Sequence, residues 1–251
     1  MALSSAPNFR HFGGGPTVNG RTVRTGLLYR SEAVLDPVGD DEGELRRAGI
    51  ALICDLRSSA ERYHAPNSWW EAQGIGRLDL NILADIRNSE AIWSTLRAHP
   101  SRVTARAIML SIYEQFPRAA LQHLGTIAGH IADGRLPLLI HCTAGKDRTG
   151  FICAMLLKAL NVEHAYIVAD YLRSSGQATA RVADHTRRLI EQKAGPDIPE
   201  AAIEAIIGVE ADYLNASMGS IEVEYGTISK HLQAAGIDGA LKGRMEKRLL
   251  L

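Results

Sequence analysis

The chain has 251 residues, 46% of them hydrophobic and 22% charged, which is the composition of an ordinary globular protein and a length that fits one large domain. Its 28 basic side chains (lysine and arginine) equal its 28 acidic ones, so overall charge does not attract the protein to nucleic acid or to an anionic membrane. No run of about 18 apolar residues is present, which excludes a conventional membrane-spanning helix.

The first half of the chain predicts strands and helices in alternation. Short apolar or alternating runs at 26–31, 50–58 and 76–83 indicate three strands, and the second is apolar enough to be buried on both faces. Apolar side chains at helical spacing follow over 108–116, where we expect Pro117 to stop the helix. A second helical pattern covers 121–131 and ends at Asp133-Gly134.

A fourth predicted strand (136–142) and a helix (149–160) enclose a polar loop, and the remaining chain is mainly helical in pattern. Apolar residues from Leu214 to Leu232 are spaced three and four apart, but Gly219 and Gly226 interrupt them, which favours core packing of two helices over a coiled coil. We therefore expect an α/β fold in a single domain, 1–251, with a core over about 1–175 and a helical C-terminal addition over about 176–251.

The three cysteines, Cys54, Cys142 and Cys153, are odd in number and fit no metal-ligand spacing. This usage favours a reducing cytoplasm over a secreted disulfide scaffold. The N-terminus lacks the pattern of a classical signal peptide, although export by another route stays open. We expect no metal and no cofactor.

The polar loop lies within the sequence HCTAGKDRTG, residues 141–150. Small residues let the backbone curl, and Gly145 can adopt a positive φ. A curled loop at a helix N-terminus points N–H groups inward and, together with the helix dipole, forms an anion site. We expect this phosphate site to consist of Thr143, Ala144, Gly145, Lys146, Asp147 and Arg148, with the planar fork of Arg148 binding two phosphate oxygens.

Cys142 lies at the start of this loop, where the helix N-terminus and a nearby arginine favour the thiolate. It is the candidate nucleophile, and attack would give a cysteinyl-phosphate that water then releases. His141 is expected to orient the cysteine through hydrogen bonds, and Thr149 to offer its hydroxyl to the sulfur. Cys54 and Cys153 are expected to be buried structural residues.

These residues resemble the cysteine-dependent tyrosine phosphatase superfamily, and more narrowly its microbial tyrosine/serine phosphatases, which often also take phosphoinositides. The resemblance extends over nearly the whole chain, through 8–14 (NFRHFGG), 27–34, 53–62, 168–175, 210–216 and 224–232. The chain departs from the family opening at His11, where aspartate is usual. The resemblance implies a sheet flanked by helices, no metal, the loop 142–148 as phosphate site, and C-terminal helices beside or over the pocket.

The resemblance also suggests roles for other residues. Asp55, Arg57 and Glu61 match a recurring family string and are interpreted as structural, while Arg10 and Arg30 are expected to border the pocket. No Trp-Pro-Asp triplet is present to supply a general acid. Two candidates therefore stay open. Asp147 lies in the loop itself, and Asp85 follows the end of a predicted strand, where it is otherwise a helix N-cap or a solvated residue.

The sequence thus predicts a metal-independent phosphomonoesterase acting on phosphotyrosine, with phosphoserine, phosphothreonine or phosphoinositides as further substrates. Lys146 is a surplus cation for a single phosphate. It would contact the additional anionic groups of a phosphoinositide, or else face solvent or pair with a carboxylate. Two other classes stay open, a phosphate-binding module without turnover and a thiol redox or arsenate-reducing enzyme. The intact Cys142, Arg148 and Thr149 weigh against the first.

Overall fold

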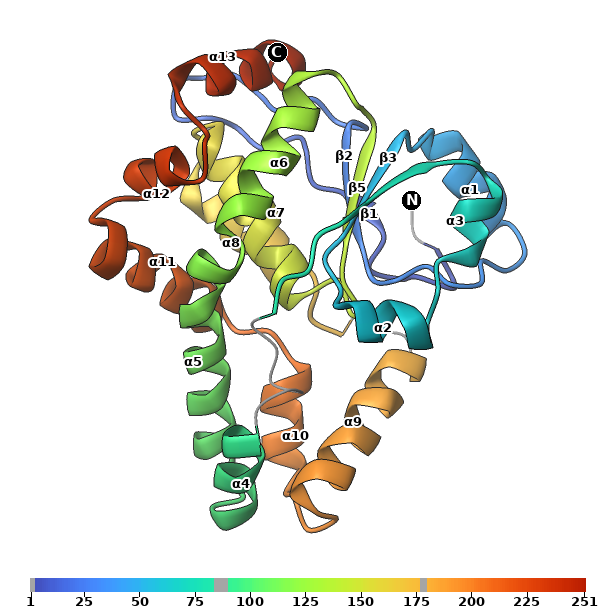
Figure 1. Ribbon diagram of the computed structural model, residues 1–251, viewed down its shortest axis with the longest axis vertical. Coiled ribbons are helices and arrows are strands. Elements are labelled where there is room, and N and C mark those ends of the chain that lie inside the picture. Colours follow the sequence, from blue (N-terminus) through green and yellow to red (C-terminus); the bar gives the residue numbers. More distant parts are fainter. Residues whose placement is uncertain (1–2, 84–89, 177–179) are drawn as a thin grey trace.

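The structure is a computed structural model that describes residues 3–83, 90–176 and 180–251 (Figure 1). Its sheet contains β1 (Arg10–His11), β2 (Leu28–Ser31), β3 (Leu52–Asp55), β4 (Gly76–Asp79) and β5 (Leu138–His141). Their order in space is β1-β2-β5-β3-β4. β1 runs antiparallel to β2, and the other neighbours are parallel. This confirms the predicted α/β class.

Helices surround this sheet and continue to the C-terminus. Those before the polar loop are α1 (Asp41–Ala48), α2 (Ser59–His64), α3 (Ser68–Ala72), α4 (Glu90–Ala98), α5 (Arg102–Ala119) and α6 (Leu121–Ala132). Those after it are α7 (Asp147–Ala159), α8 (His164–Leu172), α9 (Ala180–Ala194), α10 (Glu200–Ile207), α11 (Ala211–Tyr225), α12 (Ile228–Ala234) and α13 (Gly239–Leu249).

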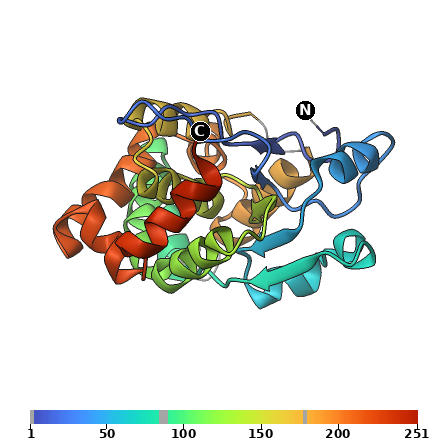
Figure 2. The same cartoon turned by 90° about the horizontal axis from the view of Figure 1, so that it is seen from above.

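Both faces of the sheet are covered, which explains why its central strands are continuous apolar runs. Side chains alternate between the two faces along each strand. The face toward α1 and α3 contributes Tyr29, Ile53 and Leu139 to a smaller core, and the opposite face contributes Leu28, Cys54 and Ile140 to a larger one formed with the remaining helices. Figure 2 shows the strands between these two unequal groups of helices.

The four predicted strands are all present, each shorter than its apolar pattern, but β1 was not predicted. A strand of two residues is too short to show the alternation that marks longer strands. The helix after the polar loop also begins two residues earlier than predicted, at Asp147, so Arg148 belongs to its first turn.

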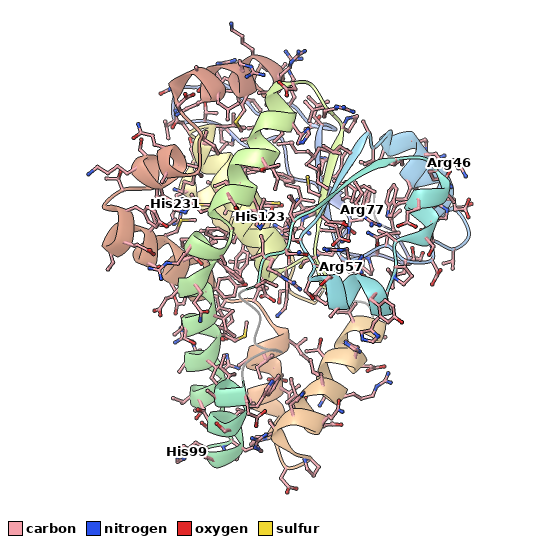
Figure 3. The ribbon with its side chains drawn as sticks, in the orientation of Figure 1. Arg46, Arg57, Arg77, His99, His123 and His231 are labelled. Atoms are coloured by element: carbon pink, nitrogen blue, oxygen red, sulfur yellow. The ribbon has the colours of Figure 1, made fainter. Side chains whose placement is uncertain are left out.

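The expectation that Pro117 stops a helix is wrong, because α5 continues through it to Ala119. A proline has no N–H to donate to the carbonyl four residues earlier, which here belongs to Tyr113. The Ser217 hydroxyl of α11 donates to that carbonyl instead, at 2.6 Å. The carbonyl of Pro117 in turn accepts from a ring nitrogen of His231 in α12, at 3.0 Å (Figure 3). Neighbouring helices therefore satisfy the groups that the proline leaves open.

The C-terminal helices share the larger core with the rest of the molecule. Leu214 and Ile221 of α11 and Leu232 of α12 are buried in that core, which confirms helix packing over a coiled coil. The core extends from Phe12 to Leu250. None of the helices in the described ranges is both long and apolar enough to cross a membrane.

Candidate active site

The polar loop joins the end of β5 to the start of α7, and its carbonyl groups are turned away from its centre. The Thr143 carbonyl accepts from the Ala33 N–H (3.2 Å), that of Ala144 from the Asn8 amide (3.1 Å), and that of Gly145 from Arg30 (2.9 Å). In a planar trans peptide the next N–H points opposite to the carbonyl. The N–H groups of residues 144–146 are therefore directed to the inner side, as an anion site requires.

Gly145 is the position at which this curl depends on glycine. Its φ is +68°, in the left-handed region. A Cβ at this residue would lie 2.3 Å from the Ser31 carbonyl oxygen and 2.4 Å from the Glu32 nitrogen. The loop thus packs directly on the backbone at the end of β2, and any side chain here would push it out of shape.

Cys142 lies at the base of the loop and is almost wholly buried. Its Sγ accepts a hydrogen bond from the Gly145 N–H at 3.2 Å, so one inward N–H already points at the sulfur. The other two cysteines are also free thiols buried in the larger core. Burial raises the pKa of Cys153 to about 12 and that of Cys54 further, which keeps both as thiols.

His141 is fixed behind the cysteine. Its Nδ1 lies 3.1 Å from the Cys142 carbonyl and its Nε2 lies 3.1 Å from the Asn67 amide nitrogen. These partners assign a neutral ring that donates from Nδ1 and accepts at Nε2. Burial lowers the pKa of His141 despite the nearby Asp55 carboxylate. This geometry agrees with an orienting role for His141.

Arg148 already has a bidentate partner, Glu61. Its two terminal nitrogens each lie 2.8 Å from a different Glu61 carboxylate oxygen, and the pair is largely buried. Glu61 also accepts from the Thr143 hydroxyl and caps the N-terminus of α2 in a capping box with Ser58. The sequence interpretation treated Glu61 as structural only. The structure adds a direct contact with the predicted phosphate-binding arginine.

Asp55 and Arg57 support this arrangement from the end of β3. Arg57 makes three contacts of 2.7–3.2 Å with the Asp55 carboxylate, and both side chains are fully buried. Figure 3 shows Arg57 beside α2 at the end of the sheet. Its other terminal nitrogen donates to the Ala65 carbonyl at the end of α2, at 2.7 Å. The pair thus ties α2, and with it Glu61, to the sheet, as expected of structural residues.

Arg10 and Arg30 do not border the pocket as predicted but lie behind the loop. Arg30 is wholly buried and its guanidinium lies 2.6 Å from the Asp170 carboxylate, which Arg10 also contacts at 3.2 Å. Burial alone would raise the pKa of Asp170, but the two guanidinium groups hold it below its usual value. These ion pairs support the rear of the phosphate loop, through the bond from Arg30 to Gly145.

Lys146 and Asp147 precede Arg148 in the predicted phosphate site, and their side chains bind different helices. The Lys146 ammonium donates to the carbonyls of Ile206 (2.6 Å) and Gly208 (3.0 Å) at the end of α10, and lies 3.5 Å from Asp147. Lysine near a helix C-terminus binds its open carbonyls and complements its dipole. Lys146 is therefore buried against the end of α10 and lies beside a carboxylate, so of the alternatives left open by the sequence the side chain facing solvent is the one that is not seen.

Asp147 lines the pocket, and its Oδ1 accepts a 2.6 Å hydrogen bond from the Tyr113 hydroxyl while its Oδ2 lies 3.5 Å from the Lys146 ammonium. The alternative acid, Asp85, lies outside the described residues. The Thr149 hydroxyl is buried and has no hydrogen-bond partner within the described part of the chain, so the predicted contact with the sulfur is not formed here. No three His, Cys, Asp or Glu side chains in the described ranges are grouped to hold a metal ion.

A pocket opens over the loop and has largely apolar walls. Its floor includes Cys142 and Arg148, and its sides come from α4, α5, α9 and α10. Sequence reasoning did not identify these wall residues, since they come from distant segments and have no motif of their own. They are Trp93, Met109, Ile112, Phe116, His185, Thr186, Leu189, Ile190 and Ile206.

Comparisons with known proteins found similarity along nearly the whole chain. A model of the tyrosine phosphatase family matches residues 1–251. The triple specificity protein phosphatase PtpB of Mycobacterium tuberculosis is 32% identical over 277 residues, 99% of this chain and 98% of that protein. A Cupriavidus necator protein whose name assigns it to the tyrosine-protein phosphatases is 32% identical over 238 residues, 94% of this chain and 83% of that protein. The crystal structure of P. aeruginosa TpbA aligns over 79% of this chain and 90% of the TpbA chain, with 16% identity and a TM-score of 0.28.

Proposed function

Since the chain belongs to the tyrosine phosphatase family and is a protein phosphatase, we propose that it hydrolyses phosphotyrosine through a cysteinyl-phosphate intermediate, without a metal ion. One observation carries this proposal. Three consecutive loop carbonyls are bonded on the outer side, so the paired N–H groups face inward around the sulfur of Cys142. Such donors hold phosphoryl oxygens as charge spreads in the transition state.

In this mechanism the Cys142 sulfur attacks phosphorus, and the bond from phosphorus to the leaving oxygen breaks. Asp147 gives its proton to that oxygen. Water then attacks the phosphorus of the cysteinyl-phosphate, passes a proton to Asp147, and the thiolate is regenerated. Arg148, aligned by Glu61 before substrate arrives, donates from its guanidinium to the phosphate oxygens while this ion pair persists. Prior alignment reduces the ordering that the transition state requires.

The walls of the pocket support an aromatic substrate. Trp93, Ile112 and Phe116 line the space above the loop, and such a surface stabilises a phenyl ring by burying it. Phosphoserine and phosphothreonine are proposed as further substrates, supported by the triple specificity that the name of the mycobacterial protein phosphatase states. Phosphoinositides are proposed on the sequence resemblance of the loop 141–150. Lys146 would help to bind an inositol phosphate only after leaving the α10 carbonyls.

A cytoplasmic location also belongs to the proposal. It is supported by the three unpaired cysteines, which suit a reducing compartment.

Turnover of a phosphotyrosine peptide by matched cysteine variants tests the function. We expect Cys142→Ser to abolish hydrolysis while phosphate or substrate still binds, because the N–H groups and Arg148 remain. Cys153→Ser, which changes a buried thiol outside the loop, should retain activity. Activity should also persist in EDTA. Loss of activity in EDTA that added metal restores, or equal loss in both cysteine variants, would contradict the mechanism.

A further inference from the structure

Two buried tyrosines connect Asp147 to the helices behind it. Tyr113 of α5 and Tyr171 of α8 are both almost wholly inaccessible to solvent. The Tyr113 hydroxyl lies 2.6 Å from Oδ1 of Asp147 and 2.7 Å from the Tyr171 hydroxyl. The only proton of Tyr113 is donated to the carboxylate, so Tyr171 must donate to Tyr113. The chain therefore has one direction, from Tyr171 through Tyr113 to Asp147.

Packing alone does not account for these hydroxyl groups. The Tyr113 ring packs against the rings of Phe116, with centroids 4.8 Å apart, and Tyr213, at 5.5 Å, contacts that a phenylalanine would also make. A buried hydroxyl costs free energy unless it is hydrogen-bonded. Both hydroxyls here serve a single carboxyl group, and hydrogen bonds in such a chain polarise and strengthen one another.

The sequence motif itself makes room for this arrangement. A Cβ at Gly150 would lie 2.7 Å from Cδ2 of the Tyr171 ring and 3.0 Å from its Cε2. Gly150 closes the HCTAGKDRTG motif, on the first turn of α7 after Arg148. A side chain at this residue would displace Tyr171, and with it the donor to Tyr113.

Two neutral phenols and one cation surround the Asp147 carboxyl group. Burial raises the pKa of Tyr113 and of Tyr171 above the ordinary phenol value, so both remain neutral donors at working pH. The Lys146 ammonium lies 3.5 Å from Oδ2 of Asp147, the oxygen that Tyr113 does not contact. The other titratable groups toward this site are Tyr213 of α11, His185 of α9, Arg30 of β2, and Cys142 and Arg148 of the loop.

We propose that Tyr113 and Tyr171 are positioning residues for the general acid. Tyr113 holds Oδ1 of Asp147, so that Oδ2, which lies 3.5 Å from the Lys146 ammonium, carries the proton given to the leaving oxygen. The same hydrogen bond stabilises the carboxylate formed by that transfer. The tyrosines themselves transfer no proton. This inference rests on the proposed function of Asp147.

The test compares Tyr113→Phe and Tyr171→Phe with Tyr213→Phe. Tyr213 is the matched control, because its ring is also buried and packs on Tyr113, while its hydroxyl donates to the Ala205 carbonyl at 3.0 Å instead of to Asp147. The kcat and KM of each variant are measured with a phosphotyrosine peptide and with 4-nitrophenyl phosphate, whose leaving group needs less help from an acid.

We expect Tyr113→Phe to lower kcat on the peptide by about tenfold or more with KM little changed, since it removes a hydrogen bond to the carboxylate that forms when Asp147 gives up its proton. Tyr171→Phe should lower kcat less, and Tyr213→Phe should leave it unchanged. The kcat of Tyr113→Phe should also fall more on the peptide than on 4-nitrophenyl phosphate.

The Asp147→Asn variant distinguishes a failure of this inference from a failure of the proposed general-acid role of Asp147. If Asp147→Asn shows the leaving-group dependence but neither Tyr113→Phe nor Tyr171→Phe lowers kcat on the peptide, the positioning role is wrong and the acid assignment stands. If Asp147→Asn lacks that dependence, the acid assignment is wrong as well. An equal loss of kcat in Tyr213→Phe would show a general effect of lost buried hydroxyls and would overturn the inference.

Discussion

Arg148 and Glu61 show what single residues contribute before substrate binds. The motif predicts Arg148, but its partner lies 87 residues away in sequence. The capping box of Ser58 and Glu61 is readable from sequence, whereas the bond to Arg148 depends on how α2 docks on the sheet. The same holds for Lys146, whose carbonyl partners are 60 and 62 residues away. Sequence therefore predicts which loop residues matter but not what they contact.

Replacing Glu61 by glutamine tests whether the aligned arginine matters for catalysis. Glutamine keeps the size of the side chain but removes the charge that holds the Arg148 fork. Because hydrogen bonds to charged groups contribute about 1.5–3 kcal/mol, we expect kcat/KM for a phosphotyrosine peptide to fall about 10–100-fold. The control is Glu44→Gln, which breaks a surface ion pair with Arg47 on α1. Equal activity of the two variants would show that Glu61 serves only to cap α2.

The buried, neutral His141 predicts how stability changes with pH. Burial lowers its pKa in the folded state, so an unfolded chain binds a proton, at a pKa of about 6.5, that the folded chain does not. The stabilisation is fully present above that pH and is lost as pH falls below it, by up to about 1.4 kcal/mol per pH unit. Urea unfolding of wild type and His141→Gln at several pH values measures this slope. A variant with an unchanged slope below about pH 6.5 would contradict the assignment.

At the scale of helices, apolar periodicity predicts that a helix is present better than it predicts the residue at which the helix ends. The helical patterns at 108–116 and 121–131 correspond to α5 and α6, but Pro117 lies inside α5. Its effect could not be predicted, because the carbonyl it leaves open is satisfied by Ser217, 104 residues away. Helix ends here depend on neighbouring helices as much as on local propensity.

Ser217→Ala should therefore destabilise the protein. It would leave the buried Tyr113 carbonyl without the donor that replaces the missing proline N–H, at a cost of about 1–3 kcal/mol. Ser220→Ala is the control, since its hydroxyl makes a similar 2.7 Å bond from α11 to the Glu114 carbonyl, but at the surface, where water can substitute. Urea unfolding should show a clear loss for Ser217→Ala and about 0.5 kcal/mol or less for Ser220→Ala. Equal losses would contradict this account.

Lys146 connects the loop to α10, and removing its charge should loosen that helix. We expect Lys146→Met to speed amide hydrogen exchange in residues 200–207 by at least about tenfold, because two charge-assisted hydrogen bonds to the helix end are lost. Lys158→Met, on α7 away from α10, should leave that exchange unchanged. If Lys146→Met left exchange in α10 unaltered, the contact would have no role in holding α10.

At the scale of the whole molecule, the class of fold follows from sequence and the arrangement does not. Buried apolar runs predict parallel strands, and the spacing after residue 176 predicts helices. The order β1-β2-β5-β3-β4 places β5 between β2 and β3, whose paired residues Leu28 and Leu52 precede Leu138 by 110 and 86 residues, which no local pattern indicates. The pocket arises only from this arrangement, because α4, α5, α9 and α10 meet above the end of β5.

The central claim is that Cys142, at the base of the inward-facing loop, carries the phosphoryl group during turnover. The most direct measurement is mass spectrometry of the protein quenched during turnover of a phosphotyrosine peptide. We predict one added phosphoryl group on the peptide that contains Cys142 in wild type and in Cys153→Ser, and none in Cys142→Ser. Phosphate found on another residue, or rapid hydrolysis by Cys142→Ser without any adduct, would contradict the account.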